Sequence, residues 1–375
     1  MRIDAHVHYT PPSILEDLAN FTRLEPYWGL LLAPNSPVQG WATAEQMIAD
    51  MGRAGLDKVV LVGEYFQRHE SCVTRNNQAL EIINRWPNSA MAFAVIQPKA
   101  GQQALDELKR CVDGGLSGVG ELNPYAQGYA LDDPDFLRLV ELCIELSLPL
   151  NLHVSEEVGH TYPGKSTTPL RHYYQLAQSY PELKLILAHW GGGLLFYELM
   201  PKTRQVLQNV WYDTAASPLL YPTAKIFQTA LTCIDHRKIL YGSDYPLRLY
   251  PGKQPKPDFN PFLNEITALN LPTPIMDDIM GNNIARLLGL LPTDTPRRHV
   301  DPPPTTVAKI SGTLPVSMVA QEWPQTQETF EKYGIPWQDS PVPAWEPIAQ
   351  AAAARGLEPV RQHALLEELV TKCES

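Results

Sequence analysis

Eight short apolar segments alternate with helix-like segments between residues 3 and 244, and this alternation constrains the fold more than any other feature. Strand patterns occur at 3–8, 58–63, 92–96, 118–122, 148–154, 183–189, 210–214 and 238–244. Strands that alternate with helices pair in parallel, and eight such repeats predict a (β/α)8 TIM barrel. An open doubly wound sheet is the alternative. No GxGxxG turn follows the first strand pattern to support it.

The 375 residues exceed the size of a barrel, which takes about 250 residues. We predict a barrel domain over 1–290, a Pro-rich linker over 291–306, and a small all-α domain over 307–375. Helical patterns in this last domain cover 316–321, 326–333, 345–355 and 360–373. A long irregular loop is expected near 11–40, where loops of this length serve as lids or binding loops.

Charge and composition exclude several classes of protein. The net charge is −11, from 30 basic and 41 acidic residues. Such a chain repels nucleic acid and anionic lipid, so neither is an expected partner. No apolar run is long enough for a membrane span, and no secretory signal pattern opens the chain. The five scattered cysteines lack a CxxC pair and indicate reduced thiols in a cytoplasmic protein.

Metal-ligating residue types stand where the predicted strands end. His6 and His8 project from the same face of the first strand, because side chains two apart on a strand point the same way. His153 and His189 end the fifth and sixth strand patterns. Glu121 ends the fourth and Asp244 the eighth. The active face of an α/β barrel is built from these strand ends, so the pattern predicts a divalent metal site with an open position for water.

Four motifs carry a resemblance to a known family. The motifs are Asp4-Ala5-His6-Val7-His8, Leu187-Ala188-His189-Trp190-Gly191-Gly192, Tyr241-Gly242-Ser243-Asp244-Tyr245-Pro246, and Gly281-Asn282-Asn283 with Ala285-Arg286-Leu287. With these motifs the chain resembles the amidohydrolase superfamily, and within it the amidohydrolase-2 branch that contains aminocarboxymuconate-semialdehyde decarboxylase-like proteins. The resemblance covers residues 1–290.

The resemblance implies the roles of the site residues. His6, His8, His153 and Asp244 look like ligands of one divalent metal, with Zn expected first and Mn, Fe or Co as alternatives. His189 looks like the catalytic acid or base beside the metal, and Asp244 can also hold the proton lost by a water.

Glu121 departs from a pattern common in binuclear relatives, which carry a carbamylated Lys at the end of the fourth strand. A carboxylate can bridge two metals, so a second ion stays open, as does a role as a hydrogen-bond partner of a ligand or a substrate contact. Asp4 shares the strand face of His6 and is expected to orient one of the imidazoles, with an ordinary buried polar residue as the alternative. Candidate substrate contacts are Tyr65, Asn123, Tyr125, Glu156, His160, Lys165, Trp190 and Arg248.

Three functions remain open from the sequence. The first is a hydrolase in which metal-activated water attacks an amide, ester or lactone carbonyl of a small molecule. The second is a metal-dependent non-oxidative decarboxylase of a small unsaturated or aromatic carboxylic acid. The third is a non-catalytic metal-bound scaffold. The resemblance to the family also implies a homodimer.

The C-terminal segment carries a second resemblance. Residues 316–372, with Phe330-Glu331-Lys332-Tyr333-Gly334-Ile335, resemble the small helical N-terminal domain of iron–sulfur cluster repair proteins. Pro336-Trp337-Gln338-Asp339 stands where that domain has a cysteine pair. We therefore expect a packing, dimerisation or docking module rather than a redox site.

Overall fold

The computed structural model describes residues 1–31, 36–292, 310–337 and 346–374. The chain divides into two compact units, Met1–Pro296 and Arg297–Ser375. The predicted linker at 291–306 lies almost entirely outside the described residues, so its bounds stay a prediction.

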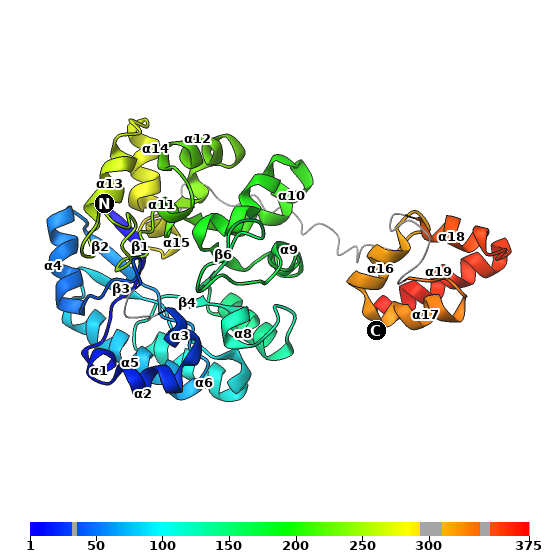
Figure 1. The fold of residues 1–375 in the computed structure, drawn as a ribbon, viewed down its shortest axis with the longest axis horizontal. Coiled ribbons are helices and arrows are strands. Elements are labelled where there is room, and N and C mark those ends of the chain that lie inside the picture. Colours follow the sequence, from blue (N-terminus) through cyan, green and yellow to red (C-terminus); the bar gives the residue numbers. More distant parts are fainter. Residues whose placement is uncertain (32–35, 293–309, 338–345, 375) are drawn as a thin grey trace. The chain divides into compact units, whose positions relative to one another are not determined.

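Parallel strands form the centre of the larger unit (Figure 1). Their bounds are β1 Ile3–Val7, β2 Lys58–Leu61, β3 Ala90–Ala92, β4 Val119–Leu122, β5 Pro149–Leu152, β6 Lys184–Leu187, β7 Val210–Asp213 and β8 Ile239–Leu240. Strands β1 to β3 pair in sequence order, as do β4 to β8. Bridges between Ala94 and Val119, and between Val7 and Tyr245, join the two sets on both sides. The strands thus close into the predicted (β/α)8 barrel.

Helices surround these strands (Figure 1). Those of eight or more residues in the larger unit are α4 Ala44–Ala54, α5 His69–Arg85, α6 Gln102–Asp113, α8 Pro134–Glu145, α9 Leu170–Ser179, η2 His189–Leu199, α12 Thr223–Cys233 and α13 Asn260–Thr267. The shorter ones are α1 Pro12–Glu16, α2 Leu18–Leu24, α3 Pro26–Leu31, η1 Pro98–Ala100, α7 Pro124–Gln127, α10 Pro201–Val206, η3 Leu207–Asn209, α11 Ser217–Leu220, η4 His236–Lys238, α14 Thr273–Asp277, η5 Asp278–Asn282 and α15 Asn283–Leu287. The Thr43 side chain caps α4, and Gly55 ends it in the left-handed region at φ 68°.

Two segments differ from the sequence prediction. The stretch at 11–40 is not a single irregular loop, because it contains α1, α2 and α3. Pro12 starts α1, and the Asp17 side chain accepts a hydrogen bond from the backbone N–H of Asn20 at the start of α2. The helix-like segment between the sixth and seventh strand patterns, at 194–207, does not form a single helix. Trp190 to Gly193 have positive φ inside η2, and Pro201 begins a separate helix, α10.

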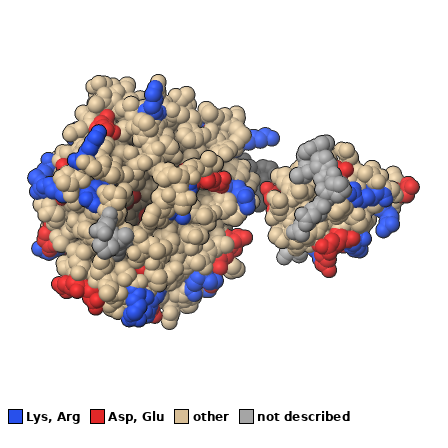
Figure 2. Space-filling model, viewed as in Figure 1, with Lys and Arg blue, Asp and Glu red and all other residues tan. Residues whose placement is uncertain are grey.

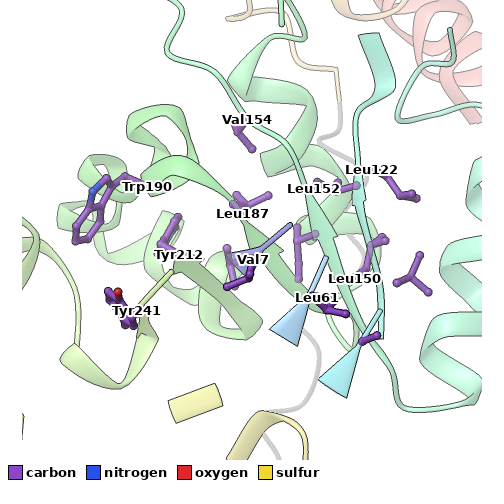
Figure 3. Packing of buried hydrophobic residues seen from close by; sticks show 14 of the residues in the cluster. Val7, Leu61, Leu122, Leu150, Leu152, Val154, Leu187, Trp190, Tyr212 and Tyr241 are labelled. Atoms are coloured by element: carbon purple, nitrogen blue, oxygen red, sulfur yellow. The ribbon is translucent and has the colours of Figure 1, made fainter. Parts of the chain in front are cut away.

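Apolar side chains on the strands pack the barrel against its helices (Figure 3). Leu150 and Leu152 on β5, Leu187 on β6 and Tyr212 on β7 are fully buried. Full burial of a Leu-sized side chain contributes about 1.5–3 kcal/mol. This packing holds the strands in register, so the residues at the strand ends have defined positions.

The smaller unit is helical, with α16 Val316–Glu322, η6 Pro324–Thr326, α17 Gln327–Lys332, α18 Ile348–Ala354 and α19 Pro359–Glu374. Its own apolar cluster includes Phe330, Ile348, Leu365 and Leu369. The four predicted helices are present, although Trp345, expected to begin the third, lies outside the described residues. Across the described parts of both units, no helix is long and apolar enough to cross a membrane.

Candidate metal centre

Six side chains, carried by five of the strands or the turns that follow them, meet at the carboxyl ends of the barrel strands. His6 and His8 come from the end of β1 and the residue after it, Glu121 from β4, and His153, His189 and Asp244 from the turns after β5, β6 and β8. They form two groups, His6–His8–Asp244 and Glu121–His153–His189, each with ligand atoms within 4.8 Å of one another. All six side chains are at most 12% exposed.

In the first group, two imidazole nitrogens face each other. The Nε2 atoms of His6 and His8 lie 3.2 Å apart, and His8 Nε2 is 3.3 Å from Asp244 Oδ1. His6 Nδ1 lies 2.9 Å from Asp213 Oδ2. Since a carboxylate only accepts, His6 carries a proton on Nδ1, and its Nε2 points into the cluster.

In the second group, Glu121 Oε1 is 2.8 Å from His153 Nδ1 and 3.3 Å from His189 Nε2. His189 Nδ1 donates to the backbone carbonyl of Ala215 at 3.0 Å, which leaves Nε2 directed at Glu121. The other oxygen, Glu121 Oε2, lies 3.6 Å from His6 Nε2. Glu121 therefore stands between the two groups and joins them.

Backbone conformation aims two of these side chains. His189 and Asp244 have φ values of 57° and 64°, in the left-handed region that costs a non-glycine residue about 1–3 kcal/mol. Hydrogen bonds hold both residues there: His189 N–H donates to Asp213 Oδ1, and Asp244 N–H donates to the His6 carbonyl. Such strain is common at functional sites.

The site favours positive charge at its centre. Burial opposes ionisation of Glu121, but the charges of His153 and His6 hold its pKa well below the usual range. Burial favours the neutral ring of His189, yet the hydrogen bond and charge of Glu121 raise its pKa to about 9. Ring nitrogens and carboxylates converge here, so the cluster can hold either a proton or a metal cation.

The comparison with protein families agrees with this arrangement. The family model described as "Amidohydrolase" matches residues 3–290. The chain belongs to the amidohydrolase family. Proteins similar to it include decarboxylases and a lactone hydrolase.

Two curated relatives resemble this amidohydrolase. A 2-amino-3-carboxymuconate-6-semialdehyde decarboxylase from Dictyostelium discoideum is 21% identical over 252 residues, spanning 58% of this chain and 66% of the relative, just under two thirds of its length. A 4-sulfomuconolactone hydrolase from Rhizobium radiobacter is 23% identical, spanning 77% of this chain and 90% of the relative.

Among solved structures, a 5-carboxyvanillate decarboxylase from Novosphingobium aromaticivorans has a TM-score of 0.61 at 15% identity. The match spans 77% of this chain and 96% of that chain. That protein was crystallised with manganese and 4-hydroxy-3-methoxy-5-nitrobenzoic acid. The similarity supports the barrel fold.

A cavity of about 690 Å³ opens over the cluster of the amidohydrolase. His8, Glu121, His153, His189 and Asp244 line its inner end. Tyr65 and His160, both predicted as substrate contacts, line it as well. The cavity is thus the place where a small molecule would meet the cluster.

Other predicted contacts lie outside this lining. Lys165 Nζ is paired with Glu156 Oε1 at 3.0 Å, and Arg248 donates to the Ser36 carbonyl. The Asn123 side chain caps α7. Tyr125 is 52% exposed.

The prediction for Trp190 is wrong. Its side chain is fully buried, Nε1 donates to Ser217 Oγ at 2.8 Å, and the ring packs edge-on against Phe227. Figure 3 shows Trp190 among the buried residues of the hydrophobic core. A positive φ of 59° turns the backbone at this residue, and the side chain enters the core.

Asp4 contacts the site differently from the expectation. Its Oδ1 accepts hydrogen bonds from the backbone N–H groups of His6 and Ser243. Among the described residues, Asp4 makes no hydrogen bond to an imidazole ring. Burial raises the pKa of Asp4 to about 7. Asp4 thus ties β1 to the turn that carries Asp244.

Asp213 is the main site residue that the sequence reasoning missed. Its Oδ2 contacts His6 Nδ1 and Asn151 Nδ2, and its Oδ1 accepts the N–H groups of His189 and Ala215. The available signal was its position at the end of a predicted strand, the same signal that identified Glu121 and Asp244.

Proposed function

We propose that this amidohydrolase binds a divalent metal ion at the cluster and hydrolyses an amide, ester or lactone of a small molecule. The observation that carries the proposal is the convergence of His6 Nε2, His8 Nε2 and Asp244 Oδ1, with Glu121 Oε2 beside them. No Lys or Arg of the described chain is ion-paired with Glu121 or Asp244. Imidazole and carboxylate ligands in this combination suit Zn, with Mn, Fe or Co as alternatives.

We propose His6, His8 and Asp244, which form one group, as metal ligands together with His153, which belongs to the other. Glu121 would orient His153, which it contacts at 2.8 Å, or would serve as a ligand of a second ion. Bound there, a divalent metal acts as a Lewis acid that lowers the pKa of a water and polarises a carbonyl.

The chain's own residues supply the proton transfers. Burial opposes ionisation of Asp244, but the hydrogen bond of His8 and the charges of the nearby histidines hold its pKa below the usual value. Asp244 is thus an ionised carboxylate, placed to accept a proton from the attacking water. His189 presents Nε2 to the cluster while the Ala215 carbonyl holds Nδ1. It is thus positioned to deliver a proton to the leaving group.

Metal content and product analysis test this proposal. Protein purified without added metal should hold about one equivalent for a single site, or about two if Glu121 bridges two ions. Ester, lactone and amide panels should show hydrolysis that chelation abolishes and added Zn²⁺ or Mn²⁺ restores. Release of CO2 from aromatic or unsaturated carboxylic acids without hydrolysis would instead support the decarboxylase. Full activity of metal-free protein would contradict both.

Single substitutions separate the two roles. His189→Ala should keep the metal and lower kcat by about 10²–10⁴-fold, because only the proton donor is removed. His153→Ala should lose both metal and activity. His363→Ala, at an exposed position of the smaller unit, is the matched control. Full activity in either cluster variant would refute the assignment.

We also propose a cytoplasmic homodimer. Cys72, Cys111, Cys143 and Cys233 are buried free thiols, as suits a reducing compartment. The smaller unit, which lacks the cysteine pair of the repair proteins, is the candidate dimerisation or docking module. Light scattering of the purified chain tests the assembly, and a monomeric mass would contradict it.

A further inference from the structure

The wall of the cavity outside the cluster is mainly apolar. Phe21, Trp28, Leu30 and Leu31 come from α2 and α3, on the segment between β1 and α4. Leu219 and Leu220 come from α11 and form another part of the wall. Figure 2 shows a hollow on the viewed face of the larger unit, bordered mostly by uncharged residues. This wall suits an apolar group rather than a charged one.

No Lys or Arg belongs to the described lining of the cavity. Lys165 is paired with Glu156, and Arg248 donates to the carbonyl of the lining residue Ser36, with its Nε buried without a hydrogen-bond partner. Buried Arg75 donates through Nη2 to Glu64 and to the Tyr9 carbonyl, and its Nη1 has no hydrogen-bond partner.

Apart from the histidines of the cluster and His160, the ionisable side chains that line the cavity are acidic. Glu121 and Asp244 belong to the cluster, and Glu64 lines the cavity from the turn after β2. Glu64 Oε1 pairs with Arg75, but Oε2 is buried without a hydrogen-bond partner. A carboxylate or sulfonate held against the apolar wall of α2, α3 and α11 would lose its hydration without gaining a cation from the described residues of that wall, which is unfavourable. An apolar group gains from the same burial.

We infer that the substrate is an uncharged amide, ester or lactone with an apolar side group, and that the cavity discriminates against substrates with an acid group on that side. This inference rests on the proposed hydrolysis and narrows its substrate. The names of the three relatives compared above contain a carboxy or sulfo group, so this chain would differ from them. In the reaction, the water gives up a proton to Asp244 as its oxygen bonds to the carbonyl carbon. The bond from that carbon to the leaving oxygen or nitrogen breaks, and the leaving atom takes a proton from His189.

A matched substrate pair tests the inference. The metal-loaded enzyme would be assayed with a δ-lactone bearing an alkyl chain, and with the same lactone whose chain ends in a carboxylate. We expect kcat/KM to be at least about 100-fold higher for the neutral lactone. Equal or higher kcat/KM for the carboxylated lactone would overturn the inference while leaving hydrolysis intact.

A binding measurement keeps the two proposals separable. The corresponding cyclic ketones, neutral and carboxylated, cannot be hydrolysed, and their affinities would be measured by calorimetry. Tighter binding of the neutral ketone supports the inference even if neither lactone is turned over, in which case the proposed hydrolysis fails. Equal or tighter binding of the carboxylated ketone, or no binding of either ketone, overturns the inference about the substrate.

A positively charged side chain introduced into the wall should shift the preference from neutral to carboxylated compounds. Leu219 is partly exposed in the lining, so Leu219→Arg introduces a guanidinium without emptying the core. We expect this variant to gain at least about 10-fold in relative affinity for the carboxylated ketone. Leu219→Gln, of similar length but uncharged, is the control and should show no such gain. An equal gain in both variants would mean that polarity, not charge, decides, and would overturn the argument.

Discussion

At the scale of single residues, Asp213 organises the site without facing the cavity. One carboxylate fixes the tautomer of His6 and the backbone N–H of His189. Partners of metal ligands with this arrangement hold the ring orientation and raise the basicity of the ligand. Asp213 therefore acts as a positioning residue for both proposed functions of the cluster, metal binding and proton transfer.

Asp213→Asn should weaken metal binding by about 10–100-fold. The amide has only one oxygen, so it cannot accept the hydrogen bonds that the two carboxylate oxygens of Asp213 accept. Competition with a chelator measures the metal Kd, and thermal unfolding of the metal-free protein measures the structural part of the effect. Asp113→Asn, at an exposed position at the end of α6, is the control. A loss of stability without any change in metal Kd would show that Asp213 is structural only.

At the scale of elements, the turn after β6 depends on glycine. Gly192 has a φ of 59°, and a Cβ there would lie 2.5 Å from the Ser155 carbonyl oxygen. This turn carries His189, and the facing backbone belongs to the turn that follows His153. The close approach of two backbones therefore sets the distance between two site residues.

Gly192→Ala should destabilise the protein by more than the roughly 1–2 kcal/mol that a left-handed alanine costs, and should lower kcat by moving His189. Gly55→Ala is the matched control, because Gly55 has a φ of 68° and open space around it. Urea unfolding and steady-state kinetics of both variants measure the difference. Equal losses in the two variants would exclude a role for the close backbone contact.

At the scale of the whole molecule, the two units have separate cores. The apolar clusters of the barrel contain residues up to 291, whereas that of the smaller unit contains residues from 310 onward. All six residues of the proposed metal site belong to the larger unit. Stability of the smaller unit and chemistry of the barrel are therefore expected to vary independently.

Phe330→Ala should destabilise the smaller unit by about 3–5 kcal/mol, because a fully buried aromatic ring is removed from a small core. Metal content and turnover of the barrel should stay unchanged. Calorimetry should show one unfolding transition shifted to lower temperature and another unaffected. A loss of bound metal in this variant would contradict the independence of the two units.

The sequence by itself determined the barrel and the position of its active end. Strand periodicity and helix caps are local properties, so the eight strand positions, the cap at Thr43 and the histidines and acids at the strand ends could be read from it. It also placed the four helices of the smaller unit. The short helices between β1 and α4, and the break in the helix after β6, depend on weaker local signals and on packing.

Only the tertiary structure decided how these residues face one another. The position of Glu121 between the two histidine groups, and that of Asp213 behind His6, depend on strands distant in sequence closing into one barrel. The direction of Trp190 depends on a left-handed backbone that its neighbours hold in place. The apolar, cation-free wall likewise assembles from α2, α3 and α11, because side chains from separate segments form a cavity only after the chain has folded.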